Sequence, residues 1–309
     1  MKILIASPIS ADALETLRAS HDVVCAYDAK KTELLGLVPD REALIFRSGV
    51  DISAEVMSAA PNLKLLIRAG SGLDNVDLDY VSANGIVLER IERPGAKAVA
   101  ELAFGLMLGV ARGIVKADSL LRQGEWAKHR IKGHLLRGKV LGVYGAGNIG
   151  ALVGEMGAAW GMEAIGCVRH PTEQREAELA SLGVRLTSAD EVVSRADYLS
   201  LHTPLDQSTR KLFDAKLIAR MKPGAFLVNL TRGGVVDESA LVEALASGHL
   251  GGVGTDVHEH EGAKFQSPLA GLDNVILTPH MGAGTIDSQR EIGERIIEIL
   301  SGFGVAGAS

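Results

Sequence analysis

Three glycines with the spacing G-x-G-x-x-G stand at Gly145, Gly147 and Gly150, after an apolar run (139–144) and at the start of a helical pattern (150–161). In this pattern the first glycine permits a tight turn and the second lets the backbone approach a pyrophosphate. The third lets the helix pack closely on the strand. The N-terminus of the helix then faces the phosphates with N–H groups that have no partner within the helix. The glycines and their context therefore predict a dinucleotide-binding turn rather than an ordinary strand–turn–helix.

The position where such chains usually carry an acid is apolar here. About 20 residues after the glycines, an Asp or Glu normally accepts hydrogen bonds from the cofactor ribose. This chain has Val168 at that position, followed by Arg169 and His170. Without the acid a 2′-phosphate is not repelled, and a guanidinium can pair with it. We therefore expect NADP to be preferred over NAD. The alternative is that Arg169 and His170 point to solvent and that NAD binds through its other contacts.

Composition excludes several other kinds of protein. The chain has 309 residues, of which 47% are apolar, and a net charge of −6 with scattered basic residues. It is long enough for about two domains, and no nucleic-acid partner is expected.

Cys25 and Cys167 form no C-x-x-C pattern, so we expect no disulfide framework, no metal site and a reducing cytoplasmic location. The first residues read as a strand rather than a signal peptide. We expect no membrane association, because no apolar run approaches the roughly 18 residues of a membrane span.

Short apolar runs alternate with helical patterns along the chain. Unbroken apolar runs indicate strands covered on both faces, as in parallel sheets, and their alternation with helices is typical of α/β proteins. A long helical segment (96–124) separates two groups of strands, which predicts two doubly wound domains joined by this segment. The predicted strands are 2–6, 43–47, 63–68, 85–89, 140–145, 163–168, 198–202, 225–230 and 274–278, and the clearest helical patterns are 10–20, 53–60 and 237–250.

Six blocks of the sequence resemble the D-isomer-specific 2-hydroxyacid dehydrogenases, and they occur in the order found in that family. The resemblance implies two Rossmann-like domains, with a cofactor domain (97–281) inserted into a discontinuous substrate domain (1–96 and 282–309). It also implies a small-molecule substrate and a homodimer, often paired through the inserted domain. The blocks are RAGSGLDNVDLD (68–79), AVAELAFGLML (98–108), GKVLGVYGAGNIG (138–150), HTPLDQST (202–209), MKPGAFLVNLTRGGVVDESALVEAL (221–245) and DNVILTPHMGAGT (273–285).

Three residues match the catalytic set of that family: Arg232, Glu261 and His280. A 2-keto acid presents a carboxylate beside a ketone, and the planar guanidinium of Arg232 can bind both groups. Hydride addition leaves an alkoxide that His280 can protonate near neutral pH, and a carboxylate at Glu261 would favour the imidazolium. Glu259 and His260 are alternatives to Glu261, because relatives commonly continue Glu-Pro where this chain has Glu-Gly.

The resemblance also implies cofactor and substrate contacts by position. Asp256 would face the nicotinamide carboxamide. The backbone N–H groups of Ser71 and Gly72 would donate to the substrate carboxylate. The other expected cofactor contacts are Asn148, Ile149, Thr203, Leu230, Thr231, Gly282 and Ala283.

Two features resemble the 3-phosphoglycerate dehydrogenases within the family. The segment FRSG (46–49) resembles an Arg-Ser pair that meets a substrate phosphate there, and residues 267–293 resemble their C-terminal block. An arginine placed for a second anion suits a substrate charged at both ends, so Arg47 and Ser48 are expected substrate contacts. The alternative is that Arg47 only pairs with a nearby acid.

The expected function is hydride transfer between a nicotinamide cofactor and 3-phosphoglycerate or 3-phosphohydroxypyruvate. Glyoxylate, hydroxypyruvate or a sulfonated hydroxy acid stay open as substrates. A nucleotide-sensing, corepressor-like binding protein is the alternative from a different functional class. The presence of Arg232, Glu261 and His280 favours the enzyme.

Overall fold

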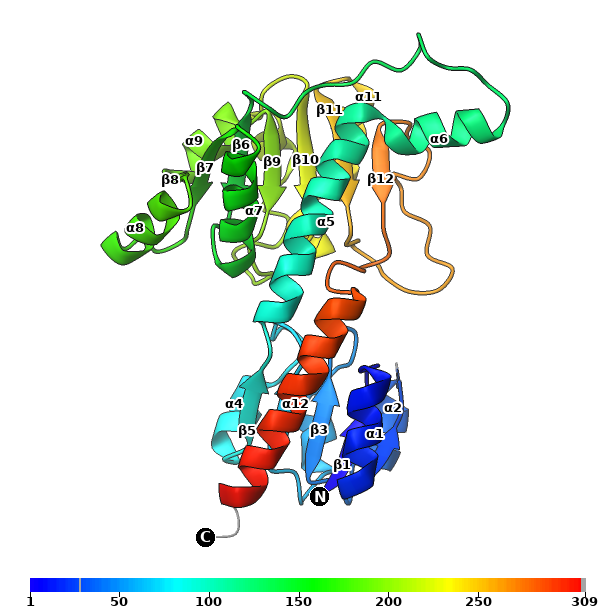
Figure 1. Cartoon of the computed structure of the whole chain (residues 1–309), viewed down its shortest axis with the longest axis vertical. Helices are drawn as coiled ribbons and strands as arrows, with labels where there is room; N and C mark the ends of the chain where they lie inside the picture. The colour runs from blue at the N-terminus through cyan, green and yellow to red at the C-terminus, as the bar shows by residue number, and fades with distance from the viewer. Residues whose placement is uncertain (28, 307–309) are drawn as a thin grey trace. The chain divides into compact units, whose positions relative to one another are not determined.

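The structure is a computed structural model that describes residues 1–27 and 29–306. The chain forms two compact units (Figure 1). One contains Met1–Gly95 and the segment from Ala283 onward, and the other contains Ala96–Gly282. The predicted boundaries, at 96/97 and 281/282, each differ from these by one residue. Each unit is built on one parallel sheet with helices on both sides, so the predicted fold class is confirmed.

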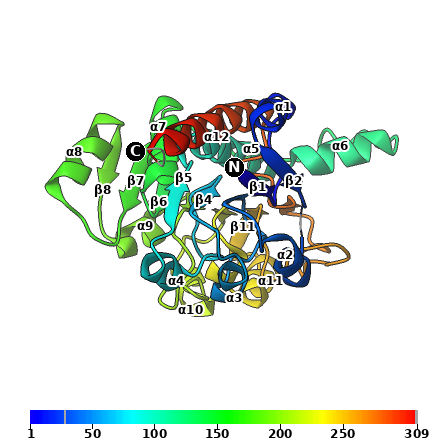
Figure 2. The same cartoon turned by 90° about the horizontal axis from the view of Figure 1, so that it is seen from below.

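The first unit has a five-stranded parallel sheet in the order β2-β1-β3-β4-β5. Its central strands are buried because helices cover both faces. Helices α1 and α12 pack on one face, where they lie side by side (Figure 2), and α2, α3 and α4 pack on the other. The elements are β1 (Lys2–Ile5), α1 (Ala11–Ser20), β2 (Asp22–Cys25), α2 (Lys31–Leu37), β3 (Ala43–Phe46), α3 (Ala54–Ser58), β4 (Leu65–Arg68), α4 (Leu78–Ala83), β5 (Val87–Arg90) and α12 (Ile286–Ala306).

The second unit has a seven-stranded parallel sheet in the order β12-β11-β10-β9-β6-β7-β8. Because β6 comes first in the chain and lies inside the sheet, the strand order reverses between β6 and β9. Ligands of open α/β sheets bind beyond the carboxyl ends of the strands at such a reversal. The elements are α5 (Arg93–Arg112), α6 (Ile114–Arg122), β6 (Val140–Tyr144), α7 (Asn148–Ala159), β7 (Glu163–Cys167), α8 (Glu173–Ser181), β8 (Val184–Leu186), α9 (Ala189–Arg195), β9 (Tyr198–Leu201), α10 (Ala215–Ile218), β10 (Ala225–Asn229), the 3₁₀ turn η1 (Gly233–Val235), α11 (Glu238–Ala246), β11 (Leu250–Thr255) and β12 (Val275–Leu277).

The segment 96–124, predicted as one long helix, forms the two helices α5 and α6. Gly113 separates them with a φ of +60°, a left-handed conformation that interrupts an α-helix. By length and composition α5 could cross a membrane. However, 61% of its apolar window is buried in the structure, as in a core helix. No other helix in the described part of the chain meets the same criteria.

Candidate active site

The glycine turn between β6 and α7 has the shape that a dinucleotide requires. Gly145 has a φ of +96°, and a methyl group there would lie 2.7 Å from the carbonyl of His202. A methyl group at Gly150 would lie 2.4 Å from the carbonyl oxygen of Gly145. At Gly147 a methyl group would meet nothing within 4 Å, so this side of the turn is open. The turn therefore leaves room for a pyrophosphate beside Gly147. The pyrophosphate would also face the first N–H groups of α7, those of Asn148 and Ile149.

Arg175, at the start of α8, holds this turn in place. Its Nε donates to the carbonyl oxygen of Ala146 at 3.1 Å, and its Nη2 donates to the same oxygen and to the carbonyl oxygen of Gly147 at 2.9 Å. Its Nη1 is paired with Glu178 at 3.0 Å. No sequence motif pointed to this residue, because the contact joins α8 to a turn 28 residues earlier.

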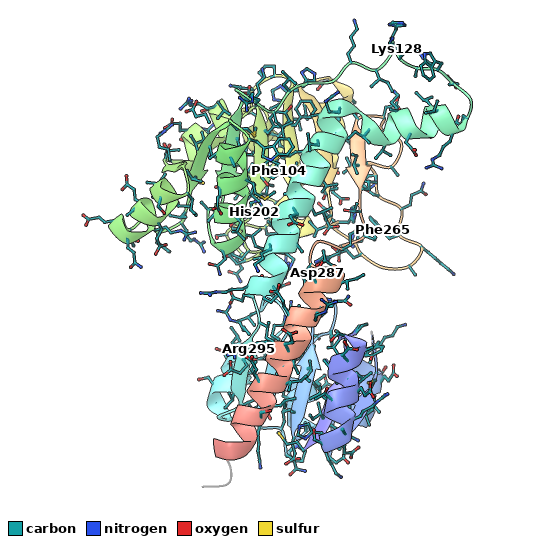
Figure 3. The ribbon with its side chains drawn as sticks, in the orientation of Figure 1. Phe104, Lys128, His202, Phe265, Asp287 and Arg295 are labelled. Atoms are coloured by element: carbon teal, nitrogen blue, oxygen red, sulfur yellow. The ribbon has the colours of Figure 1, made fainter. Side chains whose placement is uncertain are left out.

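His202, which is labelled in Figure 3, follows β9. Its backbone packs against Gly145. Its Nε2 lies 2.7 Å from the hydroxyl oxygen of Ser200. Burial lowers the pKa of His202 to about 3, so the ring is neutral at physiological pH. This histidine is therefore a structural part of the turn and not a candidate proton donor.

The expected catalytic residues follow three adjacent strands, with Arg232 after β10, Glu261 after β11 and His280 after β12. His280 Nδ1 lies 2.7 Å from Glu261 Oε2. Of the two acids considered as partners of His280, Glu261 and Glu259, the structure places Glu261 in contact with the ring. Glu259 instead pairs with Lys211 at 3.3 Å.

The carboxylate of Glu261 stays ionised at neutral pH. Burial alone would raise its pKa, but the hydrogen bond with His280 and the positive charge of that ring outweigh burial and lower it. The backbone N–H of His258 adds a further hydrogen bond to Oε1 at 3.2 Å. The carboxylate at Nδ1 fixes the orientation of the His280 ring and leaves Nε2 as the nitrogen that can transfer a proton.

Asp256 fixes the turn that carries His280. The backbone of His280 is left-handed, with a φ of +53°, which is rare for a residue other than glycine. Asp256 is 1% exposed, and its carboxylate accepts hydrogen bonds from the Thr278 hydroxyl at 2.6 Å and from the N–H groups of Met281 at 2.9 Å and Gly282 at 2.7 Å. The carboxylate thus has three donors within its own chain, and the contact with a nicotinamide stays a prediction.

Arg232 is positioned by two neighbours from the block 221–245 to which the sequence assigned no role. The side-chain amide of Asn229 accepts from the N–H and hydroxyl of Thr231 at 3.1 and 2.9 Å, and donates to the carbonyl oxygen of Arg232 at 3.2 Å. A methyl group at Gly233 would lie 1.9 Å from the backbone carbonyl of His258. The segment with Arg232 therefore packs backbone to backbone against the segment that leads to Glu261, a contact that only glycine permits.

In the first unit, Arg47 follows β3 and is half-buried. Its Nη2 donates to the carbonyl oxygen of Ala283 at 3.3 Å, and burial lowers its pKa. Within the part of the chain that the structure describes, Arg47 has no ion pair with a carboxylate. The structure therefore does not support the alternative in which Arg47 pairs with a nearby acid. Ser48 follows it on an exposed loop.

The loop after β4 presents two N–H groups. The buried Arg68 donates to the carbonyl oxygens of Gly72 at 2.8 Å and Ala69 at 3.3 Å, and so holds the loop from inside. The N–H groups of Ser71 and Gly72 have no hydrogen-bond acceptor among the residues described. They are therefore able to donate to a ligand.

The remaining predicted contacts lie at the carboxyl edge of the second sheet or just beyond it. The N–H of Thr203 adjoins Gly145, while Leu230 and Thr231 are buried directly after β10. His170 is exposed, and Arg169 is bound by two residues of the turn after β9. Gly282 and Ala283 follow His280, with Ala283 the first residue of the first unit's second segment.

These features define a two-domain α/β protein with a dinucleotide-binding turn and an Arg, Glu and His set on adjacent strands. Residues 104–282 match the family model described as D-isomer specific 2-hydroxyacid dehydrogenase, NAD binding domain. The protein belongs to the D-isomer-specific 2-hydroxyacid dehydrogenase family, whose members are oxidoreductases that act on CH–OH groups.

Individual relatives support this membership over the whole chain. The D-3-phosphoglycerate dehydrogenase of Methanocaldococcus jannaschii is 41% identical over 308 residues, which cover 98% of this chain but only 58% of that protein. The hydroxypyruvate reductase of Thermotoga maritima is 38% identical over 302 residues, 96% of each chain. The structure of D-lactate dehydrogenase from Aquifex aeolicus, complexed with NAD and lactic acid, matches with a TM-score of 0.85 and 26% identity, covering 98% of this chain and 95% of that one.

Proposed function

We propose that the protein interconverts 3-phosphoglycerate and 3-phosphohydroxypyruvate as a nicotinamide-dependent D-2-hydroxyacid dehydrogenase. The observation that carries this proposal is the 2.7 Å hydrogen bond between His280 and Glu261, at the same sheet edge as Arg232. It positions an imidazole that can transfer a proton at the same sheet edge as a guanidinium, and reduction of a 2-keto acid requires both groups. The similarity to a D-3-phosphoglycerate dehydrogenase supports the choice of substrate.

Each residue has one task in the proposed reaction. The glycine turn (Gly145, Gly147 and Gly150) would hold a nicotinamide dinucleotide, which would supply or accept the hydride. Arg232 binds the substrate carboxylate and the reacting oxygen, and the N–H groups of Ser71 and Gly72 bind the carboxylate as well. His280 transfers the proton from Nε2 to the reacting oxygen during reduction and takes it back during oxidation. Glu261 holds the ring by Nδ1 and stabilises its charge.

The half-buried guanidinium of Arg47 supports a substrate with a second anionic group. A desolvated cation without a carboxylate partner is stabilised by an anion such as a phosphate. Hydroxypyruvate or glyoxylate is a second candidate substrate, because the similarity to a hydroxypyruvate reductase covers 96% of that protein's length. A sulfonated hydroxy acid would also carry a second anion.

Replacing Arg47 by alanine is expected to distinguish these substrates. The KM for 3-phosphohydroxypyruvate should rise by about 10–100-fold, because a charged hydrogen bond is lost, while the KM for glyoxylate stays close to that of the wild type. Initial rates with a reduced nicotinamide cofactor measure both. Arg295→Ala removes an exposed arginine that pairs with Glu298 at 2.7 Å and serves as the control. Equal changes for both substrates would assign Arg47 a structural role and leave hydroxypyruvate or glyoxylate as the substrate.

The proposed cofactor is NADP in preference to NAD. Val168 leaves no acid to repel a 2′-phosphate, and Arg169 follows at a position where a guanidinium can bind one. We place the enzyme in the cytoplasm, which its two free thiols suit. Tight binding of a dinucleotide without turnover of any 2-keto acid would favour the corepressor-like alternative instead.

We further propose that two copies pair through an arm formed by α6 and the segment that follows it (113–137). The arm extends away from the sheet of the second unit (Figure 1). It carries several exposed apolar side chains, which mark interaction surfaces when they gather in this way. They are Ile114, Val115, Leu121, Trp126 and Leu135, and Trp126 is 78% exposed.

Replacing Trp126 by glutamate is expected to weaken the dimer by about 30-fold or more, because buried tryptophans are frequent centres of binding energy. Sedimentation over a range of concentrations measures the dissociation constant. Ile286→Glu is the matched control, since Ile286 is also 78% exposed but lies outside the arm. An unchanged dimer in the Trp126 variant, or a monomeric wild type, would contradict pairing through the arm.

A further inference from the structure

Arg169 is bound by a carboxylate from the end of a different strand. Its Nη1 donates to Asp206 Oδ2 at 3.1 Å, and its Nη2 donates to the hydroxyl of Ser208. Arg169 follows β7, while Asp206 and Ser208 lie in the turn after β9. Because β7 and β9 flank β6 in the sheet, this ion pair reaches across the end of the strand that carries the glycine turn.

Asp206 is a fixed and permanently charged group. Its Oδ1 accepts from the N–H of Ser208 at 2.7 Å, the hydroxyl of Ser208 at 2.6 Å and the N–H of Thr209 at 3.1 Å. Only Oδ2 is directed to Arg169. The hydrogen bonds from Ser208, with that from Arg169, lower the pKa of Asp206 to about 2. Arg169 therefore faces a carboxylate at every physiological pH.

The ion pair of Arg169 and Asp206 lies where the cofactor is expected to bind. The strand order reverses between β6 and β9, and a dinucleotide bound at the glycine turn lies along this edge of the sheet. Its adenosine ribose is expected near the end of β7, where Val168 replaces the usual acid. The turn after β9 thus brings an acid to the same edge from another element and directs it at the one guanidinium expected to bind a 2′-phosphate.

We propose that Asp206 is a specificity-determining residue that limits the preference for NADP by holding Arg169. This inference rests on the proposed function as a nicotinamide-dependent dehydrogenase. NAD leaves the pair of Arg169 and Asp206 intact. NADP requires Arg169 to exchange Asp206 for the 2′-phosphate, and the released carboxylate then stays near a second anion. The pair is exposed, with side chains 59% and 41% accessible, so the exchange has a modest cost and NADP is still accepted.

The test is to replace Asp206 by asparagine and to measure the binding of NADPH and NADH without substrate, by titrating the fluorescence of the reduced nicotinamide. Asparagine keeps an oxygen for the hydrogen bonds of the turn but carries no negative charge to hold the guanidinium. The ratio of the NADH Kd to the NADPH Kd is expected to rise by about 2–5-fold over the wild type. Asp206→Ser, which also retains an acceptor for the turn, is the second variant and is expected to shift the ratio in the same direction.

A double variant shows whether the gain acts through Arg169. Asp206→Asn combined with Arg169→Ala is expected to lose the gain in NADPH binding. Asp40→Asn is the control, because Asp40 is similarly exposed (49%) and forms an ion pair with Lys2 at 2.9 Å. An unchanged ratio in both Asp206 variants, or a gain that persists without Arg169, would overturn the inference while leaving the proposed function intact. A wild type that binds neither dinucleotide would overturn the proposed function and this inference with it.

Discussion

Replacing His280 by alanine is expected to lower kcat by about 10²–10⁴-fold, the usual contribution of a positioned general acid or base. The loss should fall mainly on kcat rather than on KM, because the proton moves in the transition state and the substrate is bound by other residues. Steady-state rates of 2-keto acid reduction measure it. Cofactor binding, followed by fluorescence titration, should stay unchanged.

His260→Ala is the control for this substitution. His260 is exposed and neighbours Glu261 in the sequence, but it makes no contact with His280 among those that the structure describes. Its loss is expected to leave kcat unchanged. A wild-type kcat in the His280 variant, or an equal loss in both variants, would remove the pair of His280 and Glu261 from the mechanism.

Replacing Arg232 by lysine is expected to lower kcat/KM by about 10²–10³-fold, even though the positive charge is kept. An ammonium is a point charge and does not reproduce the two parallel hydrogen bonds of a guanidinium to a carboxylate and its neighbouring oxygen. Both kcat and KM should change, since Arg232 is proposed to bind the ground state and the developing charge alike.

The matched control is Arg220→Lys. Arg220 forms an exposed ion pair with Asp190 at 3.0 Å, and such pairs contribute little. This variant is expected to behave as the wild type. Rates within a few-fold of wild type for Arg232→Lys would show that a single positive charge suffices, and the proposed two-oxygen contact would be wrong.

The fold could be predicted from the sequence wherever strands are apolar throughout. Each predicted strand overlaps an observed one, because unbroken apolar runs reflect burial on both faces. Three strands were missed for physical reasons. Strands β2 and β8 lie at sheet edges and carry polar residues, whereas β11 is rich in glycine. Methyl groups at Gly252 and Gly254 would lie 2.4 Å from Val110 and 2.9 Å from Leu106, so these glycines let α5 pack closely on the strand.

The candidate site could likewise be predicted only in part from the sequence. Motifs located the glycine turn, Arg232, Glu261 and His280, because their chemistry fixes both residue type and spacing. Residues that position these groups had no role assigned from the sequence: Asn229 and Gly233 lie in the block 221–245 but act through contacts around Arg232, and Arg175 acts from a separate helix. Asp206 lies in the block 202–209, but its contact with Arg169 forms only because β7 and β9 flank β6 in the folded sheet. Such contacts depend on tertiary structure and leave no local pattern.

The central claim, that this chain reduces a 2-keto acid with a nicotinamide cofactor to a D-2-hydroxy acid, is tested most directly by one reaction. The purified protein is incubated with NADPH and 3-phosphohydroxypyruvate, the loss of reduced nicotinamide is followed by absorbance, and the chirality of the product is determined. We expect saturable turnover that yields D-3-phosphoglycerate. No turnover of this or any other 2-keto acid while the dinucleotide binds tightly, or formation of the L isomer, would contradict the account.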